Sequence, residues 1–331
     1  MSDEILVFGA GSWGSALAIQ LAHNGHTVHL YVRKSSAYQQ LSETRMNAKY
    51  LPGIAFPPSL KVTDDWPSVM SKCRYILIAT PSIVFSETLN LIKKFAEKKT
   101  IISATKGFCH LSYQLLDQLA DKILPDNAFS VITGPSFAKE VAKQLPTAVL
   151  VASKNREVAK TVQALFNSAT FRCYTSGDVT GAEIGGAVKN VLAIACGISD
   201  GFGFGANASA ALITRGLKEM IQLGLSLGAR AETFSGLSGL GDLVLTCTDN
   251  QSRNRRFGVL LGQGKTKAQA IGEIRQVVEG IETARAIYRL SQKQAVEMPI
   301  VSTVYQVLYE NCPLESAVNT LLTRDLKAEY V

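Results

Sequence analysis

The chain has 331 residues, of which 47% are hydrophobic and 18% charged, and it carries a formal net charge of +7. This length allows two domains of ordinary size, and this composition excludes a disordered or low-complexity chain. The positive charge raises the question of nucleic acid, but basic residues form no run longer than pairs such as Arg255-Arg256. We therefore expect small anionic ligands and no nucleic-acid partner.

The cysteines and the apolar segments exclude further classes. Six cysteines lie far apart, with no Cys-x-x-Cys pair and no Cys/His cluster of zinc spacing, so we expect reduced cytoplasmic thiols and no metal site. The acidic first residues lead directly into a strand-like run, which predicts no signal peptide. The best membrane candidate, Val191 to Ile198, is shorter than the roughly 18 to 20 residues that a span requires, so a buried helix is the simpler interpretation.

The first predicted elements are typical of a dinucleotide site. A short apolar strand, Ile5 to Phe8, ends in Gly9-Ala10-Gly11-Ser12-Trp13-Gly14, and a helix-like segment begins at once. Gly9 permits the tight turn, Gly11 lets the backbone approach a pyrophosphate, and Gly14 lets the helix pack on the strand. Free N–H groups at the start of the helix favour the same anion. The setting therefore predicts a dinucleotide-binding loop.

The second predicted strand, Thr27 to Val32, bears on which dinucleotide binds. Where a carboxylate would hold the adenosine ribose 2′-hydroxyl, the chain has Arg33 followed by Lys34. Cationic side chains there suit a 2′-phosphate, so NADP(H) is predicted ahead of NAD(H). Two alternatives stay open: Arg33 can be an ordinary solvated charge, and such glycine loops also occur in FAD-binding and nucleoside-transferring proteins.

Strand-like runs continue to alternate with helical stretches to about residue 175. The further runs are Tyr75 to Ala79, Thr100 to Ser103, Phe129 to Thr133, Ala148 to Ala152 and Phe171 to Tyr174. This alternation predicts a Rossmann-type α/β domain with a mostly parallel sheet over residues 1–180. Ligands of such sheets gather at the carboxyl ends of the strands, so the loops there should ring one crevice. Those loops are Gly9 to Gly11, Arg33, Thr80 to Ser82, Thr105 to Gly107 and Gly134 to Ser136.

Beyond residue 180 the pattern changes to long helical periodicity, which predicts an all-α substrate domain over residues 181–331. The first helix of this domain carries small residues at 181, 182, 185, 186, 187, 193 and 195. Small residues let neighbouring helices approach closely, so we expect this helix at the centre of the domain. The glycine-rich stretch Gly201 to Asn207 is predicted to be a tight or mobile connection, with a lid role as the alternative.

The histidines and tyrosines limit the chemistry. All four histidines (23, 26, 29 and 110) lie in the first third of the chain, whereas a lactate or malate dehydrogenase needs a His/Asp pair in the second half. None of the ten tyrosines has a lysine four places on, which excludes the short-chain dehydrogenase pattern. His23, His26 and His29 run from a helix end into a strand and share no face, so surface or capping roles are expected rather than metal binding.

Lys189 is the leading candidate for acid/base catalysis. It lies in a helix otherwise made of small and apolar residues, where an unpaired ammonium is costly. Burial would lower its pKa from about 10.4 towards the working range, while a nearby carboxylate or a substrate phosphate would raise it, and the net direction stays open. The alternative is a lysine that extends from the helix edge into water.

Two further groups would complete a substrate site. The glycine-rich turn Gly236 to Gly241 delivers the carboxylate of Asp242, and Ser252-Arg253-Asn254 opens a new helical segment. Hydroxyl, guanidinium and N–H groups at one helix start form an anion site. Asp242 as a helix cap and Arg253 as a surface charge are the alternatives. With Lys106 and Lys189, these residues predict a pocket for a small phosphorylated hydroxy compound.

Seven short motifs in this order and spacing point to one family: Gly9 to Gly14, Ala104 to Gly107, Gly134 to Ala138, Gly185 to Asn190, Gly239 to Asp242, Ser252 to Asn254 and Val277 to Gly280. Over nearly its whole length the chain resembles the bacterial-type NAD(P)-dependent glycerol-3-phosphate dehydrogenases. The resemblance implies reversible reduction of dihydroxyacetone phosphate to sn-glycerol 3-phosphate, the backbone precursor of phospholipids. It also implies a homodimer.

The resemblance further implies roles for single residues, with Lys189 as the acid/base. The implied cofactor contacts, besides the loop glycines, are Ser12, Trp13, Arg33, Lys34, Lys106, Ala138, Arg253, Val277 and Glu279. The implied substrate contacts are Lys106, Gly134, Ser136, Lys189, Asp242, Ser252, Arg253 and Asn254. Two rivals stay open: a 6-phosphogluconate or β-hydroxyacid dehydrogenase with a catalytic lysine, and a redox-sensing protein that binds NADP(H) without turnover.

Overall fold

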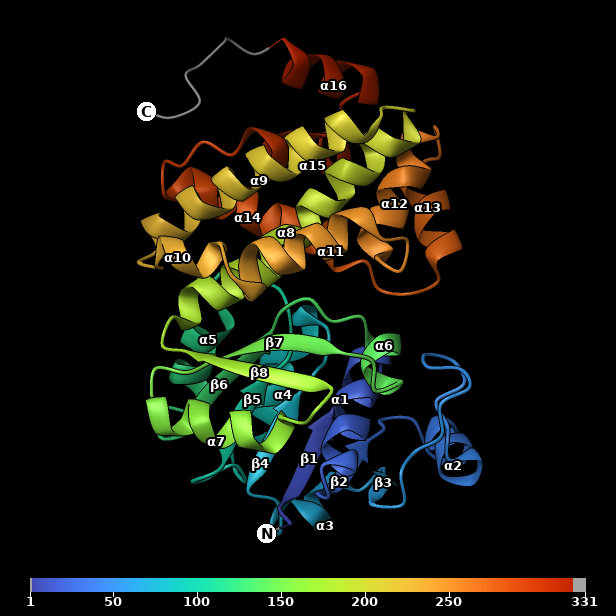
Figure 1. Cartoon of the computed structure of the whole chain (residues 1–331), viewed down its shortest axis with the longest axis vertical. Coiled ribbons are helices and arrows are strands. Elements are labelled where there is room, and N and C mark those ends of the chain that lie inside the picture. Colours follow the sequence, from blue (N-terminus) through green and yellow to red (C-terminus); the bar gives the residue numbers. More distant parts are fainter. Residues whose placement is uncertain (1, 324–331) are drawn as a thin grey trace.

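The computed structural model describes residues 2–323, which form a sheet flanked by helices and a helical part stacked on the carboxyl ends of its strands (Figure 1). In this part of the chain the strands are β1 (Glu4–Phe8), β2 (Thr27–Tyr31), β3 (Leu60–Thr63), β4 (Tyr75–Ile78), β5 (Thr100–Ser103), β6 (Ala128–Thr133), β7 (Thr147–Ala152) and β8 (Phe171–Ser176). Their order is β3-β2-β1-β4-β5-β6-β7-β8. Neighbouring strands run parallel except β6 and β7, which confirms the predicted mostly parallel sheet.

Helices cover both faces of this sheet and form the second part of the molecule. The sheet part contains α1 (Ser12–His23), α2 (Ser35–Thr44), α3 (Trp66–Met70), the 3-10 turn η1 (Ser82–Val84), α4 (Phe85–Ile92), α5 (Leu116–Ile123), α6 (Ala138–Ala142) and α7 (Arg156–Phe166). The helical part contains α8 (Val179–Gly201), α9 (Ala206–Ser226), α10 (Ala231–Phe234), the π-helical turn η2 (Leu237–Gly241), α11 (Asp242–Thr248), α12 (Arg253–Gly262), α13 (Lys267–Ile274), α14 (Glu279–Lys293), α15 (Pro299–Tyr309) and α16 (Leu314–Leu322). An all-helical second part was predicted for residues 181–331; residues 324–331 lie outside the described residues.

One strand was missed in the sequence. Strand β3 lies at the edge of the sheet beside β2, and of its four residues only Leu60 is buried. A run of four residues with one buried side chain carries too little alternation to be recognised. All seven predicted strands are present at the expected places.

Helix α8 forms the core of the helical part. It is buried along nearly its whole length, and α9, α11, α12, α14 and α15 all pack against it. By length and composition α8 could cross a membrane, but its apolar window lies entirely inside the protein. The sequence predicted that no apolar segment reaches the length of a membrane span. This prediction was wrong, because the helix continues through Lys189 and Asn190. The buried-helix interpretation is confirmed.

Asp178 fixes the start of α8 at the boundary between the two parts. Its carboxylate accepts hydrogen bonds from Gly181 N at 2.8 Å, Arg230 N at 2.9 Å and Thr233 Oγ1 at 2.6 Å. The first bond caps α8, and the other two hold the turn that leads into α10. One buried side chain thus joins the end of the sheet part to two elements of the helical part.

Glycines allow α8 and α12 to cross with their backbones in contact. A Cβ added at Gly197 would lie 2.1 Å from a carbonyl oxygen of α12, and one added at Gly258 would lie 2.2 Å from a carbonyl oxygen of α8. Gly201 and Gly262, one turn further along each helix, repeat the arrangement at 2.4 Å. The closest approach of α8 to α12 therefore lies beyond residue 195, the last of the small residues from which the sequence predicts close helix packing.

Alanine at this crossing should destabilise the protein. For Gly197→Ala and Gly258→Ala we expect a loss of about 1 to 3 kcal/mol in the free energy of unfolding, because the added methyl group forces the two backbones apart. The matched control is Gly272→Ala in α13, where nothing lies within 4 Å of the position that the new Cβ would take. That change should stabilise by about 0.5 to 1 kcal/mol. Urea denaturation measures the free energy of unfolding of all three variants. Equal changes for Gly197→Ala and Gly272→Ala would contradict the close contact between α8 and α12.

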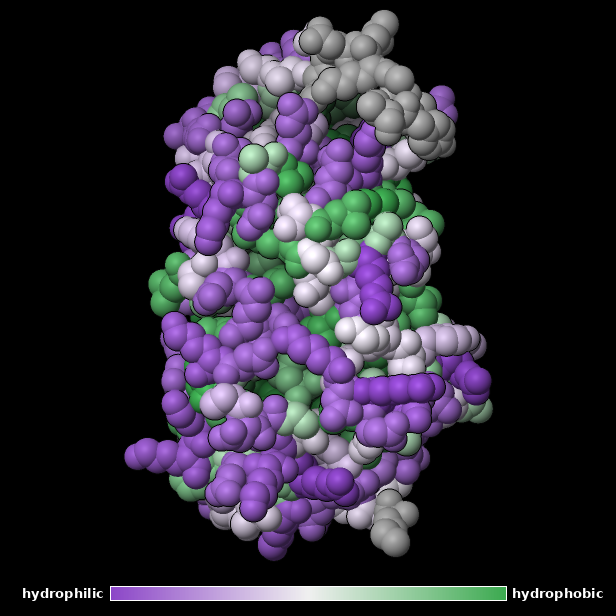
Figure 2. All heavy atoms as spheres, turned by 90° about the vertical axis from the view of Figure 1, so that its left-hand side faces the viewer, coloured by the Kyte–Doolittle hydropathy of each residue, from purple (hydrophilic) through white to green (hydrophobic). Residues whose placement is uncertain are grey.

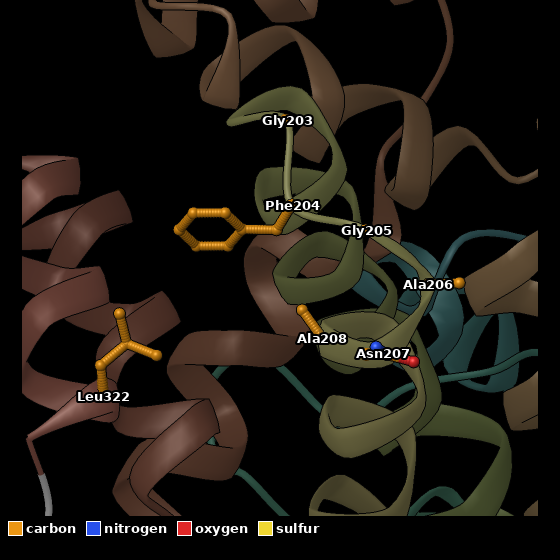
Figure 3. Close-up of a pocket in the computed structure, with 7 residues that line it drawn as sticks. All are labelled: Gly203, Phe204, Gly205, Ala206, Asn207, Ala208 and Leu322. Atoms are coloured by element: carbon orange, nitrogen blue, oxygen red, sulfur yellow. The ribbon is translucent and has the colours of Figure 1, made fainter.

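The glycine-rich connection between α8 and α9 lies at the outer end of the helical part, away from the sheet (Figure 1). It lines a cavity of about 600 Å³ together with Leu322 of α16, and the ring of Phe204 points across this cavity towards Leu322 (Figure 3). Since the connection does not border the carboxyl ends of the strands, its position gives no support to the lid alternative.

Candidate active site

Lys189, in the middle of α8, is held inside the protein rather than at a helix edge. Its side chain is 7% exposed. Its Nζ donates one hydrogen bond to a carboxylate oxygen of Asp242 and another, of 2.9 Å, to Thr246 Oγ1. Thr246 lies one turn after Asp242 in α11, so both acceptors come from one helix face. The alternative of a lysine extending into water is wrong.

Asp242 bridges the sheet to the helical part. Its second carboxylate oxygen accepts a hydrogen bond of 2.8 Å from Lys106 Nζ, which also donates to Gly134 O at 3.3 Å. Lys106 and Gly134 come from the loops after β5 and β6. Asp242 is fully buried and is the first residue of α11, and its carboxylate binds two ammonium groups rather than capping the helix. We call Lys106, Lys189, Asp242 and Thr246 the lysine–aspartate cluster.

The electrostatics of the cluster suit proton transfer near neutral pH. Burial lowers the pKa of Lys189 to about 7, with Lys106 adding to the decrease and the Asp242 carboxylate opposing it. The net direction that the sequence left open is therefore downward. A group with its pKa near the working pH both gives and takes a proton readily, which is the property that general acid/base catalysis requires.

Local chain geometry explains how Asp242 reaches Lys189. The π-helical turn η2 precedes Asp242, and wide turns of this kind are frequent at functional sites. A Cβ added at Gly185 of α8 would lie 2.3 Å from Ser238 O, and one added at Gly239 would lie 2.1 Å from Phe234 O. Gly185 therefore lets η2 lie directly on α8, and Gly239 lets η2 fold closely against the end of α10. The glycine-rich sequence is thus what brings the carboxylate to the lysine.

The start of α12 forms a second polar group beside α8. Ser252 Oγ caps this helix by accepting a hydrogen bond of 3.2 Å from Arg255 N. The Asn254 amide donates to Asn190 Oδ1 at 2.9 Å, and its carbonyl oxygen accepts from Gly280 N at 2.9 Å. Because Asn190 follows Lys189 directly, these bonds fix the start of α12 next to the lysine–aspartate cluster.

Arg253 is largely buried at this helix start, and its charge has no direct partner in the part of the chain that the structure describes. Burial lowers its pKa, and Glu279 and Tyr50 oppose that shift. Among the described residues Arg253 forms no ion pair and no hydrogen bond. Glu279 instead accepts a hydrogen bond of 2.9 Å from Ser82 Oγ, which ties the loop after β4 to α14. A buried guanidinium without a partner is suited to an anionic ligand.

The loop between β1 and α1 fits the pyrophosphate of a dinucleotide. Gly9 has φ +111°, and a Cβ at Gly14 would lie 1.9 Å from Gly9 O, so both positions require glycine. Gly11 precedes α1 with nothing within 4 Å of the position that a Cβ would take, and no side chain caps the helix. Trp13 Nε1 is buried without a hydrogen-bond partner in the described chain. Free donors and open space at a helix start are the conditions under which phosphate binds.

The remaining predicted residues divide into those near the cluster and those apart from it. Trp13 has its ring centroid 5.9 Å from Lys106 Nζ, and Ser136 Oγ donates to Gly134 O at 2.9 Å. Ala138 begins α6, the next helix. Arg33 and Lys34 are exposed between β2 and α2, and Val277 is half exposed before α14. No hydrogen bond or ion pair in the described chain joins these last three to the cluster.

Sequence reasoning missed three side chains of the site. Thr246 could have been found, because it lies four residues after Asp242 on a predicted helix. Ser82 was noted only as part of a loop, and its bond to Glu279 joins positions 197 residues apart. Tyr50, which acts on Arg253, comes from the loop after α2 and has no local signal in the sequence.

Comparisons with known proteins indicate the family. The family model of the NAD-dependent glycerol-3-phosphate dehydrogenase N-terminus matches residues 4–159, and that of the C-terminus matches residues 178–319. A relative from Francisella tularensis subsp. novicida, named as a glycerol-3-phosphate dehydrogenase of the NAD(P)+ type, is 55% identical over 331 residues. That match covers 99% of this chain and 100% of the relative.

Solved structures agree as well. The glycerol-3-phosphate dehydrogenase of Coxiella burnetii has a TM-score of 0.95 at 44% identity, covering 98% of this chain and 99% of the other. The enzyme of the same name from Saccharomyces cerevisiae has a TM-score of 0.83 at 27% identity, covering 97% and 99%. With two family models spanning most of its length and a relative of more than half identical sequence, the chain belongs to the NAD-dependent glycerol-3-phosphate dehydrogenase family.

Proposed function

We propose that this dehydrogenase reduces dihydroxyacetone phosphate to sn-glycerol 3-phosphate reversibly, with Lys189 as the acid/base and NADPH as the preferred cofactor. The observation that carries the proposal is the buried ammonium of Lys189, held by Asp242 and Thr246. Residues 1–180 then form the cofactor domain and residues 181–331 the substrate domain, with the reaction at their junction. The product would supply the synthesis of glycerophospholipids.

The side chains of the lysine–aspartate cluster have separate roles in the proposed reaction. Bound NADPH supplies the hydride that C2 of the ketone receives. Lys189 as ammonium gives a proton to the C2 oxygen, and as amine it takes that proton back in the reverse direction. Asp242 holds Lys189 and Lys106 at fixed positions, which spares the reaction the cost of ordering them.

The start of α12 is the proposed site of the substrate phosphate. Arg253 brings an unpaired buried charge, and Ser252 and Asn254 flank it with a hydroxyl and an amide. Phosphate binds well where guanidinium and helix N–H groups converge. The loops that hold Gly134, Ser136 and Ala138 would line the junction between this phosphate site and the cofactor.

Arg33 is the proposed reason for a preference for NADPH. For Arg33→Ala we expect kcat/KM with NADPH to fall by about 10- to 100-fold, since a charge-assisted hydrogen bond contributes roughly 1.5 to 3 kcal/mol. The value with NADH should change little, because NADH lacks the 2′-phosphate. The control is Lys72→Ala, an exposed lysine at the other end of the sheet. A wild-type enzyme that strongly prefers NADH would refute this role for Arg33.

A spectrophotometric assay tests the function as a whole. Oxidation of NADPH or NADH should follow addition of dihydroxyacetone phosphate and should not follow addition of ketones derived from hydroxy acids. The opposite substrate preference would support the 6-phosphogluconate or β-hydroxyacid dehydrogenase rival. Tight cofactor binding without consumption on any ketose phosphate would support the redox-sensing rival.

We also propose that the enzyme is a cytoplasmic homodimer. On the face drawn in Figure 2 the sheet part is largely hydrophilic, whereas hydrophobic residues reach the surface of the helical part. Exposed large apolar side chains of the helical part as a whole include Leu225, Leu240 and Val244. All six cysteines are free thiols, as is usual in a reducing compartment. Light scattering after size-exclusion chromatography measures the mass, and a value near 35.6 kDa would mean a monomer.

A further inference from the structure

Three side chains with metal-binding donors meet near the amino ends of β1 and β4, at the end of the sheet opposite the lysine–aspartate cluster. Glu4 begins β1, His29 lies in β2, and Cys73 lies just before β4. Since β1 lies between β2 and β4 in the sheet, the three residues are neighbours despite a span of 70 positions. Glu4 Oε2 lies 2.9 Å from His29 Nε2, and one ligand atom from each residue lies within 4.8 Å of the other two.

We propose that Glu4, His29 and Cys73 bind a zinc ion. Carboxylate oxygen, imidazole nitrogen and thiolate sulfur are the donors that zinc takes in proteins. In a tetrahedral zinc site, with bonds of about 2.0 to 2.3 Å, two ligand atoms lie roughly 3.3 to 3.8 Å apart. The observed separations reach these values with side-chain shifts of about 1 Å. Three protein ligands leave the fourth position to water.

The cluster is fixed by its surroundings. Arg74 N donates to Glu4 O at 3.3 Å, and Lys99 Nζ donates to Cys73 O at 2.7 Å, so the main chain at two of the three ligands is held. The side chains of His29 and Cys73 are buried, whereas that of Glu4 is 36% exposed and opens the cluster to solvent. An ion would enter past Glu4 and find the other two ligands already in place.

Charge balance also favours a divalent ion. Zinc binding would release the thiol proton of Cys73 to solvent as the Zn–S bond forms. One carboxylate and one thiolate then neutralise the ion, which limits repulsion by Lys72 and Lys99, the nearby ammonium groups.

The metal lies apart from the reaction and is expected to stabilise the sheet. Strand β1 spans five residues, Glu4 to Phe8, before the glycine loop begins, or about 16 Å at 3.3 Å per residue. The proposal contradicts the expectation of surface or capping roles for the histidines. His29 could not be recognised as a ligand from spacing, because its partners lie 25 residues before and 44 residues after it.

Cobalt is the spectroscopic probe for this site. After removal of metals by a chelator, one equivalent of Co²⁺ should give a thiolate-to-cobalt charge-transfer band and the intense visible bands of tetrahedral cobalt, and Zn²⁺ should displace them. Cys73→Ser should abolish the charge-transfer band, whereas the control Cys312→Ser, in the helical part, should leave it unchanged. Absence of the band in the wild type overturns the proposal. Its persistence in Cys73→Ser, as expected if Cys196 and Cys247 bind the ion instead, also overturns it.

A second variant guards against misfolding of the first. Glu4→Gln is nearly isosteric at a half-exposed position, so it should fold normally. It should weaken zinc affinity at least about tenfold, measured by competition with a chromogenic chelator, and reduce the rise in Tm that zinc gives the wild type. Zinc affinity equal to that of the wild type would overturn the proposal.

Discussion

Replacing Lys189 with alanine should lower kcat for the reduction of dihydroxyacetone phosphate by about 10²- to 10⁴-fold, the usual contribution of a general acid. The reason is that no other protonated group in the cluster can replace it: Asp242 is an acceptor for both lysines, and Lys106 is held by Gly134 O as well. Steady-state kinetics in both directions measure the effect. Turnover close to normal, with cofactor and substrate bound normally, would refute the acid/base role.

Two controls separate chemistry from structure in this variant. Cofactor binding, followed by the fluorescence of NADPH, should be close to that of the wild type, because the hydrogen bonds of Lys189 in the described chain go to Asp242 and Thr246 and not to the glycine loop. Small primary amines added to Lys189→Ala should restore part of kcat, since they replace the missing proton carrier. A variant that bound NADPH poorly and failed to respond to amines would indicate a structural role.

The pH dependence gives an independent check of the same residue. With the pKa of Lys189 lowered to about 7, the ammonium needed for ketone reduction is present below pH 7 and lost above it. The rate of reduction should therefore fall as pH rises through about 7, whereas the rate of glycerol 3-phosphate oxidation should rise. In Lys189→Ala both pH-dependent limbs should disappear.

The second large loss of activity is expected from substitution of Arg253. Truncation to alanine should cost about 2 to 5 kcal/mol, as for a buried charge pair that loses one partner, which corresponds to about a 30- to 5,000-fold fall in kcat/KM. The physical reason is that Arg253 is largely buried and forms no ion pair with any residue of the described range 2–323, where Glu279 acts on its charge only from a distance. The fall should be measured with dihydroxyacetone phosphate as the varied substrate.

Two comparisons make the Arg253 prediction specific to the phosphate. Arg256→Ala removes an exposed arginine from the same helix and should change kcat/KM little. Unphosphorylated dihydroxyacetone should be reduced equally slowly by wild type and Arg253→Ala, since this substrate has no phosphate for Arg253 to hold. A large loss with this truncated substrate would place Arg253 elsewhere in the mechanism.

The parts of the site that the sequence predicted are those with a local physical cause. Gly9 and Gly14 act within one strand–turn–helix unit, so their spacing alone identifies the turn. Lys189 could be expected to be buried because the residues around it in its own helix are small or apolar, so this helix has no polar face. By contrast, Asp242 and Lys106 are 136 positions apart, and the sequence placed them in one pocket without predicting the hydrogen bond between them.

The features that the sequence did not predict depend on packing between distant segments. Strand β3 is stabilised by β2, which no pattern within its four residues reveals. The contact between α8 and α12 depends on Gly197 and Gly258 facing each other, and a glycine in a helix is otherwise interpreted as a weakness. Glu4, His29 and Cys73 meet only because β1 lies between β2 and β4 in the sheet.

Because Asp178 anchors the start of α8, a small rotation of that helix at its start displaces the residues further along it. Lys189 lies eleven residues along a continuous helix from this anchor, or about 16 Å at 1.5 Å per residue. A rotation of the helical part by about 5° at Asp178 would move Lys189 by roughly 1.4 Å, more than the ~0.5 Å tolerance of a catalytic geometry. Substitutions at Asp178, far from any reacting atom, should therefore lower kcat.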